Sequence, residues 1–154
     1  LSYTGGRGWS GFSVAGLQLF DDRGELERIA ELFGQYPDGR SDARGIEVEG
    51  VAAARFGNRD FAFVLSERGS FVGVYDISNP RSPFFVQFLP SGISPEGVVA
   101  IPSRALVVTA DEVSGTLSIF EGIRGLPFDP RRPLPFSFDG PFGALSGLDD
   151  APGG

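Results

Sequence analysis

The sequence of 154 residues contains no cysteine, histidine, lysine or methionine. Without cysteine and histidine, the chain cannot build a disulfide, a thiolate nucleophile, a Cys/His zinc site or a Ser-His-Asp triad. A metal bound here would therefore be a hard cation held by oxygen ligands. All 13 basic residues are arginine, which we attribute to codon usage rather than to function.

Positive charge and long apolar runs are also scarce. The 13 arginines face 20 acidic residues, which gives a formal net charge of −7 and argues against nucleic acid or an anionic membrane surface as a partner. The longest apolar runs, such as FFVQFLP, are far shorter than the ~20 residues that span a bilayer. We therefore expect no transmembrane segment in this chain, and the first residues do not read as a signal peptide.

The composition is rich in Gly (23), Pro (12) and Phe (15), which is typical of short strands joined by tight turns. One amphipathic helix is predicted within DDRGELERIAELFGQYPDG. Its apolar face consists of Leu26, Ile29, Ala30 and Phe33. Asp22 is placed to cap its start, and Gly34 and Pro37 end it.

From residue 45 the pattern changes to strands. Four β-rich runs follow one another: EVEGVAAARF, DFAFVLSERG, SFVGVYDIS and PFFVQFLP. The series then restarts with PEGVVAIP, RALVVTADE and GTLSIFEG, so that EGVAAA at 49–54 returns as EGVVAI at 96–101. A period of roughly 40–50 residues with four strands is typical of a propeller blade. The predicted fold class is all-β, with four-stranded antiparallel blades, an incomplete propeller and one short helical insertion.

The predicted organisation has four parts. Residues 1–44 hold the end of a preceding blade and the helical insertion, and 45–122 hold about two blades. Residues 123–140 are a Pro/Gly-rich linker, and 141–154 begin a further module. Closed propellers use about four to eight blades. We therefore expect a piece of a larger propeller protein, whose partners are the remaining blades of the same polypeptide or other protein chains.

Several runs follow one another as in bacterial choice-of-anchor I proteins: GRGWSGFSV, DGRSDARGIEVEGVAAA, FAFVLSERGSFVGVYDISNPRSPFFVQFLP and VVTADEVSGTLSIFEG. This resemblance covers about residues 5–121. The ending GPFGALSGLDDAPG resembles the opening of the propeller of the "esterase-like activity of phytase" family, over 136–151. The segment LPSGIS is shorter than the excursion that choice-of-anchor I proteins often carry there.

These resemblances imply a secreted β-propeller protein located in the periplasm or outside the cell. They also imply Ca²⁺-dependent phosphoric-ester hydrolysis in the full-length protein. The alternative is a non-catalytic scaffold or protein-interaction propeller. The acids of the phytase-like module would lie beyond this chain, so no catalytic residue is assigned. The run GGRG lacks the Lys-Ser/Thr of a P-loop, and no nucleotide cofactor is expected.

Glu49 and Glu96 occupy equivalent places in the innermost strands of successive blades. Inner strands surround the central channel of a propeller, so both carboxylates are candidate ligands for one Ca²⁺, and Glu47 projects on the same strand face as Glu49. The alternative is architectural. In that interpretation Glu accepts backbone N–H groups at the strand entry, and the following Gly permits close packing of blades.

Two further sets of charged residues are candidates. In the loop RSDARG, Arg40 and Arg44 are placed to hold a phosphate between two guanidinium groups, unless the loop is tied down by an internal Arg–Asp pair. The matching turns SERGS and ADEVSG carry acidic residues, which are either Ca²⁺ ligands or ordinary turn chemistry. These residues are Glu67, Asp111 and Glu112.

Overall fold

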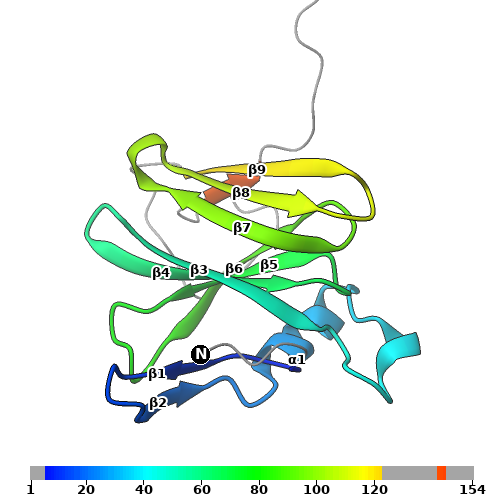
Figure 1. Cartoon of the computed structure of the whole chain (residues 1–154), viewed down its shortest axis with the longest axis horizontal. Helices are drawn as coiled ribbons and strands as arrows, with labels where there is room; N and C mark the ends of the chain where they lie inside the picture. The colour runs from blue at the N-terminus through cyan, green and yellow to red at the C-terminus, as the bar shows by residue number, and fades with distance from the viewer. Residues whose placement is uncertain (1–5, 123–141, 145–154) are drawn as a thin grey trace, which may run out of the picture.

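Two four-stranded antiparallel sheets dominate the computed structural model, which describes residues 6–122 and 142–144 (Figure 1). The first sheet contains β3 (Val48–Phe56), β4 (Arg59–Ser66), β5 (Phe71–Asp76) and β6 (Phe84–Pro90). The second contains β7 (Pro95–Ile101), β8 (Leu106–Asp111), β9 (Thr116–Gly122) and β10 (Phe142–Ala144). Two single-turn 3₁₀ helices, Asp38–Arg40 and Pro102–Arg104, precede β3 and follow β7.

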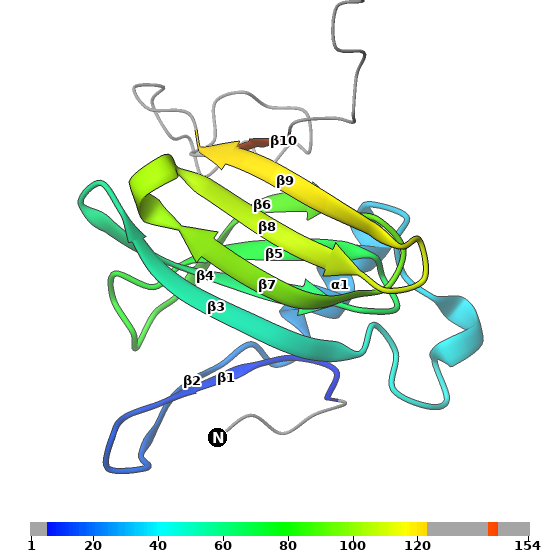
Figure 2. The ribbon, with the colours of Figure 1, turned by 45° about the horizontal axis from the view of Figure 1, so that its top comes forward.

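The strand order identifies each sheet as a propeller blade. Within each sheet, neighbours in sequence are neighbours in space. The chain leaves the first sheet at its outer strand β6 and enters the second at β7, which lies beside β3 (Figure 2). Up-and-down sheets whose first strands lie side by side are the units of a propeller. The seven predicted strands are confirmed, and so is the predicted fold class of an incomplete all-β propeller.

A hairpin and one helix precede the first blade. The hairpin pairs β1 (Ser10–Phe12) with β2 (Gln18–Asp21), and α1 spans Glu25–Leu32. The predicted cap takes a variant form, because Gly24 occupies the N-cap position while the Asp22 carboxylate accepts the Leu26 N–H at 3.2 Å. Leu26 and Ala30 are fully buried on the first sheet, as the amphipathic pattern predicted.

The hydrophobic core lies on both faces of the first sheet. One cluster fills the space between the two blades; its buried members are Phe61, Phe63, Leu65, Val72, Val74, Val86, Leu89, Val107 and Phe120. The other lies under α1 and the residues around the hairpin; its buried members are Leu26, Ala30, Ile46, Val48, Ala62, Val64, Phe71, Tyr75 and Phe88. Burial on both faces explains why β4 and β5 are apolar at almost every position, without polar alternation.

The C-terminal part is described only at β10. Residues 142–144 pair antiparallel with β9 and supply the fourth strand of the second blade. They fall at the start of the range 141–154 that the sequence assigns to a further module, and that assignment stays a prediction. The other residues of that predicted module, 145–154, and the predicted linker at 123–140 lie outside the described residues.

Candidate functional site

The repeated Glu-Gly phrase forms the same backbone irregularity in both blades. The pairing of β3 with β4 shifts at Glu49, and the pairing of β7 with β8 shifts at Glu96. Each glutamate is thus the extra residue of a β-bulge at the start of an inner strand. A Cβ added to Gly50 would lie 2.7 Å from Leu65 Cδ1 and 3.5 Å from the Glu96 carbonyl oxygen. A larger residue at this position would therefore crowd the Leu65 side chain of β4, while the neighbouring inner strand lies at ordinary contact distance.

The equivalence of the blades extends to the residues around each bulge. Glu47 and Ser94 stand two positions before the bulges, and both have left-handed backbones with φ of 51° and 57°. Both side chains are buried. Their carbonyl oxygens accept the N–H groups of Glu67 at 2.9 Å and Glu112 at 2.8 Å, in the turns that follow β4 and β8. Each blade therefore brings one bulge glutamate and one turn glutamate to the same end.

Like charges accumulate at this end of the blades. Carboxylate oxygens of Glu47, Glu49 and Glu67 lie within 4.8 Å of one another. Burial raises the pKa of Glu67, and the charges of Glu49 and Glu47 raise it further, against the opposing effect of the Arg68 guanidinium. The pKa of Glu96 is also raised, first by the charge and hydrogen bond of Glu112 and more weakly by Glu49.

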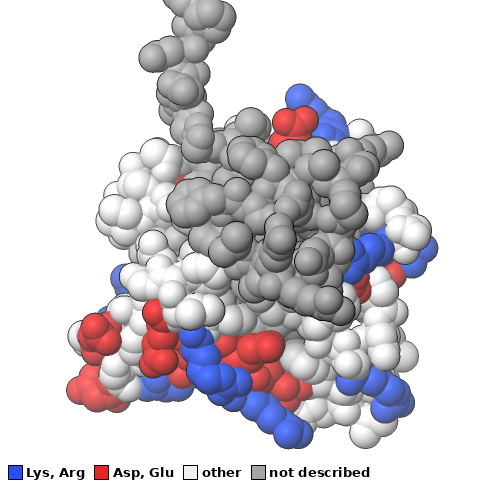
Figure 3. Space-filling model, turned by 180° about the vertical axis from the view of Figure 1, so that it is seen from behind, with Lys and Arg blue, Asp and Glu red and all other residues white. Residues whose placement is uncertain are grey.

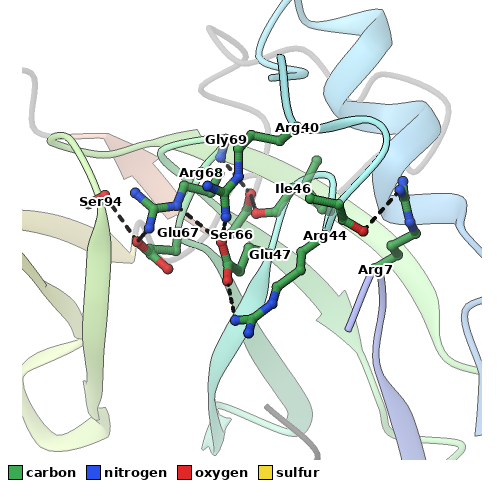
Figure 4. A network of polar contacts seen from close by, with 11 residues as sticks. Arg7, Arg40, Arg44, Ile46, Glu47, Ser66, Glu67, Arg68, Gly69 and Ser94 are labelled. Carbon is green, nitrogen blue, oxygen red and sulfur yellow. Dashed lines mark hydrogen bonds and ion pairs between the residues drawn. The ribbon is translucent and has the colours of Figure 1, made fainter. Parts of the chain in front are cut away.

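Glu47 differs from the other four glutamates because arginines surround it (Figure 4). Its side chain is only 3% exposed, and it accepts hydrogen bonds from Arg44 Nη1 at 2.6 Å, Arg40 Nη2 at 2.7 Å and Arg68 Nε at 3.1 Å. Burial acts to raise the pKa of Glu47. The hydrogen bonds from Arg44 and Arg68 and the charges of Arg40 and Arg44 outweigh it, so the pKa is lowered. Arg68 also contacts Glu67, with 3.0 Å between Nη2 and Oε1.

These contacts place the residues predicted as an anion site. Arg40 and Arg44 do come together, and they do so on Glu47 rather than on the aspartate of their own loop. The alternative expected for this loop, an internal Arg–Asp pair, is replaced here by pairs of both arginines with a glutamate. Phosphate binding by the two guanidinium groups stays a prediction.

The same contacts bear on the predicted calcium ligands. Both carboxylate oxygens of Glu47 already accept guanidinium N–H groups, and a divalent cation there would face three positive charges. Glu47 thus does not fit a Ca²⁺ ligand. Glu49 is half-buried and Glu96 is exposed. Calcium binding by this pair stays a prediction.

Glu49 and Glu96 both border one groove. Its volume is 820 Å³, and it lies between the hairpin and the inner strands β3 and β7. Aromatic and aliphatic side chains line the rest of it, including Trp9, Phe12 and Val98. The groove therefore combines apolar side chains with two carboxylates.

The surface outside the groove shows no large region of one sign on the face seen in Figure 3. Acidic and basic side chains intermingle there among the described residues, over the lower part of the view. The helices in the described part of the chain are too short or too polar to cross a lipid bilayer.

Comparison with known proteins identifies a family. A family model described as the choice-of-anchor I domain matches residues 1–80. The chain belongs to the choice-of-anchor I domain family. The matched residues include the hairpin, α1 and the first three strands of the first blade. The resemblance described from the sequence extends further, to about residue 121. No curated protein and no solved structure matches significantly.

Membership of the choice-of-anchor I domain family supports a β-rich bacterial protein that is secreted or attached to the cell surface. It does not distinguish the periplasm from the extracellular space. The family match also carries no support for phosphoester hydrolysis. The phytase-like resemblance of the last residues stays a prediction.

Sequence reasoning missed the part that Arg68 plays. In its turn, SERGS, the sequence points only to Glu67, yet Arg68 pairs with both Glu47 and Glu67 at the start of the first blade. Another ion pair, between Arg59 and Asp76, joins β4 and β5 at the opposite end. The available signal was the presence of Arg44 and Arg68 on either side of Glu47 in the sequence. The pairing of β3 with β4, which brings Arg68 to Glu47, is not local in sequence.

Proposed function

We propose that this chain is a structural and interaction module of a secreted or cell-surface propeller protein, without chemistry of its own. The observation that carries the proposal is that the charged groups around Glu47 are already paired with one another. The buried Glu47 uses both carboxylate oxygens to hold three guanidinium groups. Such a network fixes the entry of the first inner strand and leaves neither a free base nor a free anion clamp.

The absence of histidine and cysteine from the sequence supports the same proposal. General acid–base work would fall to the carboxylates around the groove, of which Glu96 and Glu67 have raised pKa values. Among the residues that the structure describes, neither has beside it the pattern of nucleophile, base and orienting group that covalent catalysis needs. Their raised pKa values follow from burial and from neighbouring carboxylates, which are consequences of packing two identical bulges together.

The test is a hydrolysis assay on the purified chain with a panel of phosphate monoesters and diesters, with millimolar Ca²⁺ and with chelator. We expect no turnover above the buffer rate in either condition. Turnover that is lost on the substitution Glu49→Gln, but retained on Glu31→Gln, would overturn the proposal. Glu31 is an exposed helical residue and serves as the matched control.

Calcium binding without catalysis is the second candidate. It is supported by the groove that Glu49 and Glu96 both border and by the like-charge pair of Glu96 and Glu112, which a cation would relieve. Glu49 and Glu96 would be its ligands, while Glu47 would stay with its arginines. A ligand that binds only the folded state raises the unfolding temperature with concentration. Ca²⁺ should therefore raise the melting temperature of the native chain and of Glu31→Gln, but not of the double variant Glu49→Gln, Glu96→Gln. Equal shifts in all three proteins would exclude this pair as the site.

A further inference from the structure

The outer face of the second blade is apolar and uncovered by the described residues. Residues that pair directly across strands point to the same face of a sheet. The outer face accordingly carries one complete aliphatic row and parts of two others, which end in Gly97 and Glu121; its aliphatic members are Val99, Ile101, Leu106, Val108, Ala110, Leu117 and Ile119. Leu117 is 65% exposed, Val99 51% and Ile119 41%. Figure 2 shows this sheet in front of the first, with no other described strand on its outer side.

The register identifies what this face corresponds to in the first blade. The two bulges align Gly97 with Gly50, and the pairings then align the row Val99, Val108, Ile119 with the row Ala52, Phe63, Val74. In the first blade, that face is the one that packs against the second blade. The open face of the second blade is therefore equivalent to the face by which the first blade already binds its neighbour.

The neighbour that fits is also defined by the existing interface. The second blade meets the first through its opposite face, with Val107 and Phe120 buried at 0% and 2% exposure and Val98 and Ala100 packed around them. This interface requires small aliphatic residues near the inner strand and one aromatic residue on the third strand. A further blade with the same pattern would continue the stack without a change of geometry.

A second copy of this chain does not offer the required face. The face of the first blade equivalent to Val107 and Phe120 is covered within the chain, because α1 and Trp9 pack on it. Leu26 Cδ1 lies so close to β5 that a Cβ on Gly73 would be 2.7 Å away. Head-to-tail stacking of identical chains is therefore blocked at one end by the helix and open at the other.

We infer that the outer face of β7–β8–β9 binds a further four-stranded blade that is not among the described residues, in the orientation in which the second blade binds the first. The inference deepens the proposed interaction function and rests on it. Its chemical requirement is an apolar sheet face with small residues near the inner strand and one aromatic side chain on the third strand.

The absence of cysteine from the sequence allows a direct test. The variant Leu117→Cys reports on the outer face, and Asn58→Cys, in the exposed turn between β3 and β4, is the matched control. Each variant is labelled with a thiol reagent in two preparations: the protein isolated from cells that express its own gene, and the 154-residue chain alone. Burial slows labelling to the rate at which the covering element opens, so protection is read as a ratio of rates.

We expect Leu117→Cys to label at least about tenfold more slowly in the cellular protein than in the 154-residue chain, and Asn58→Cys to label equally in both. Equal rates for Leu117→Cys in both preparations would overturn the inference. Slow labelling of Leu117→Cys in the 154-residue chain alone would also overturn it. If the molecular mass in solution is then twice that of the chain, a second copy covers the face; if it is that of one chain, other residues of the same chain cover it. None of these outcomes depends on the hydrolysis or calcium assays, so the inference and the proposed function fail separately.

Discussion

Replacing Glu47 by glutamine tests whether the arginine network holds the start of the first inner strand. Glutamine keeps the shape but removes the charge that three guanidinium groups share. A hydrogen bond to a charged group contributes ~1.5–3 kcal/mol. The three arginine side chains are 40%, 57% and 39% exposed and regain water when the charge is lost. The sum must therefore be discounted, and we expect a loss of about 2–3 kcal/mol in the free energy of unfolding at pH 7.

The pH dependence of this loss has a definite sign. Because the folded protein lowers the pKa of Glu47 below 4.5, its contribution is complete above that value and disappears as the pH falls through the lowered pKa. Urea unfolding of native chain and Glu47→Gln should therefore show a gap that is largest at pH 7 and narrows in acid. Glu31→Gln, the exposed control, should change the unfolding free energy by less than about 0.5 kcal/mol. A Glu47→Gln variant as stable as this control at pH 7 would refute the reasoning.

Two further predictions concern the bulges. Gly50→Ala should lower the free energy of unfolding in urea by about 1–3 kcal/mol, because the new methyl group would meet Leu65. Gly97→Ala is the control: its methyl group has ordinary space, and the loss should be smaller. Equal losses in the two variants would argue against a close contact at Gly50. Glu96→Gln should raise the melting temperature at pH 7, because the charge of Glu112 raises the pKa of Glu96 and the ionised form loses stability as the pH rises through that value. The gain should vanish below the ordinary pKa of 4.5, and a gain that persisted in acid would have another cause.

The strands were predictable from sequence because their signals are local. Alternation, turn residues and the repeated Glu-Gly phrase gave seven strands and the blade register without any knowledge of contacts. The conformation of Glu47 was not predictable in this way. Its left-handed backbone and its burial depend on three arginines, one of which, Arg68, reaches it from the turn after β4. A bulge also cannot be distinguished from a regular strand entry by a single strand's sequence, since it is a property of the pairing.

The candidate calcium site shows the same division. The sequence correctly placed Glu49 and Glu96 at equivalent positions, and both border one groove. It assigned Glu47 to their set because residues two apart on a strand share a face. The bulge and the positive φ of Glu47 break that rule, and the side chain turns to the arginines instead. Period-two reasoning fails where the strand is not yet regular.

The central claim is that the described residues form two consecutive blades held as one unit by the core between them. Trp9, the single tryptophan, lies on the far side of the first blade, 4.9 Å between ring centroids from Tyr75, and reports on that blade alone. Phe120 lies in the second blade and is buried between the two. The deciding measurement is urea unfolding of Phe120→Ala followed by Trp9 fluorescence and by far-ultraviolet circular dichroism.

The account predicts one transition, coincident in both signals, displaced by about 3–5 kcal/mol as for a phenylalanine removed from a core. A Trp9 transition that stays at its native midpoint, while the circular dichroism signal changes earlier, would show that the second blade does not pack on the first, and would contradict the account.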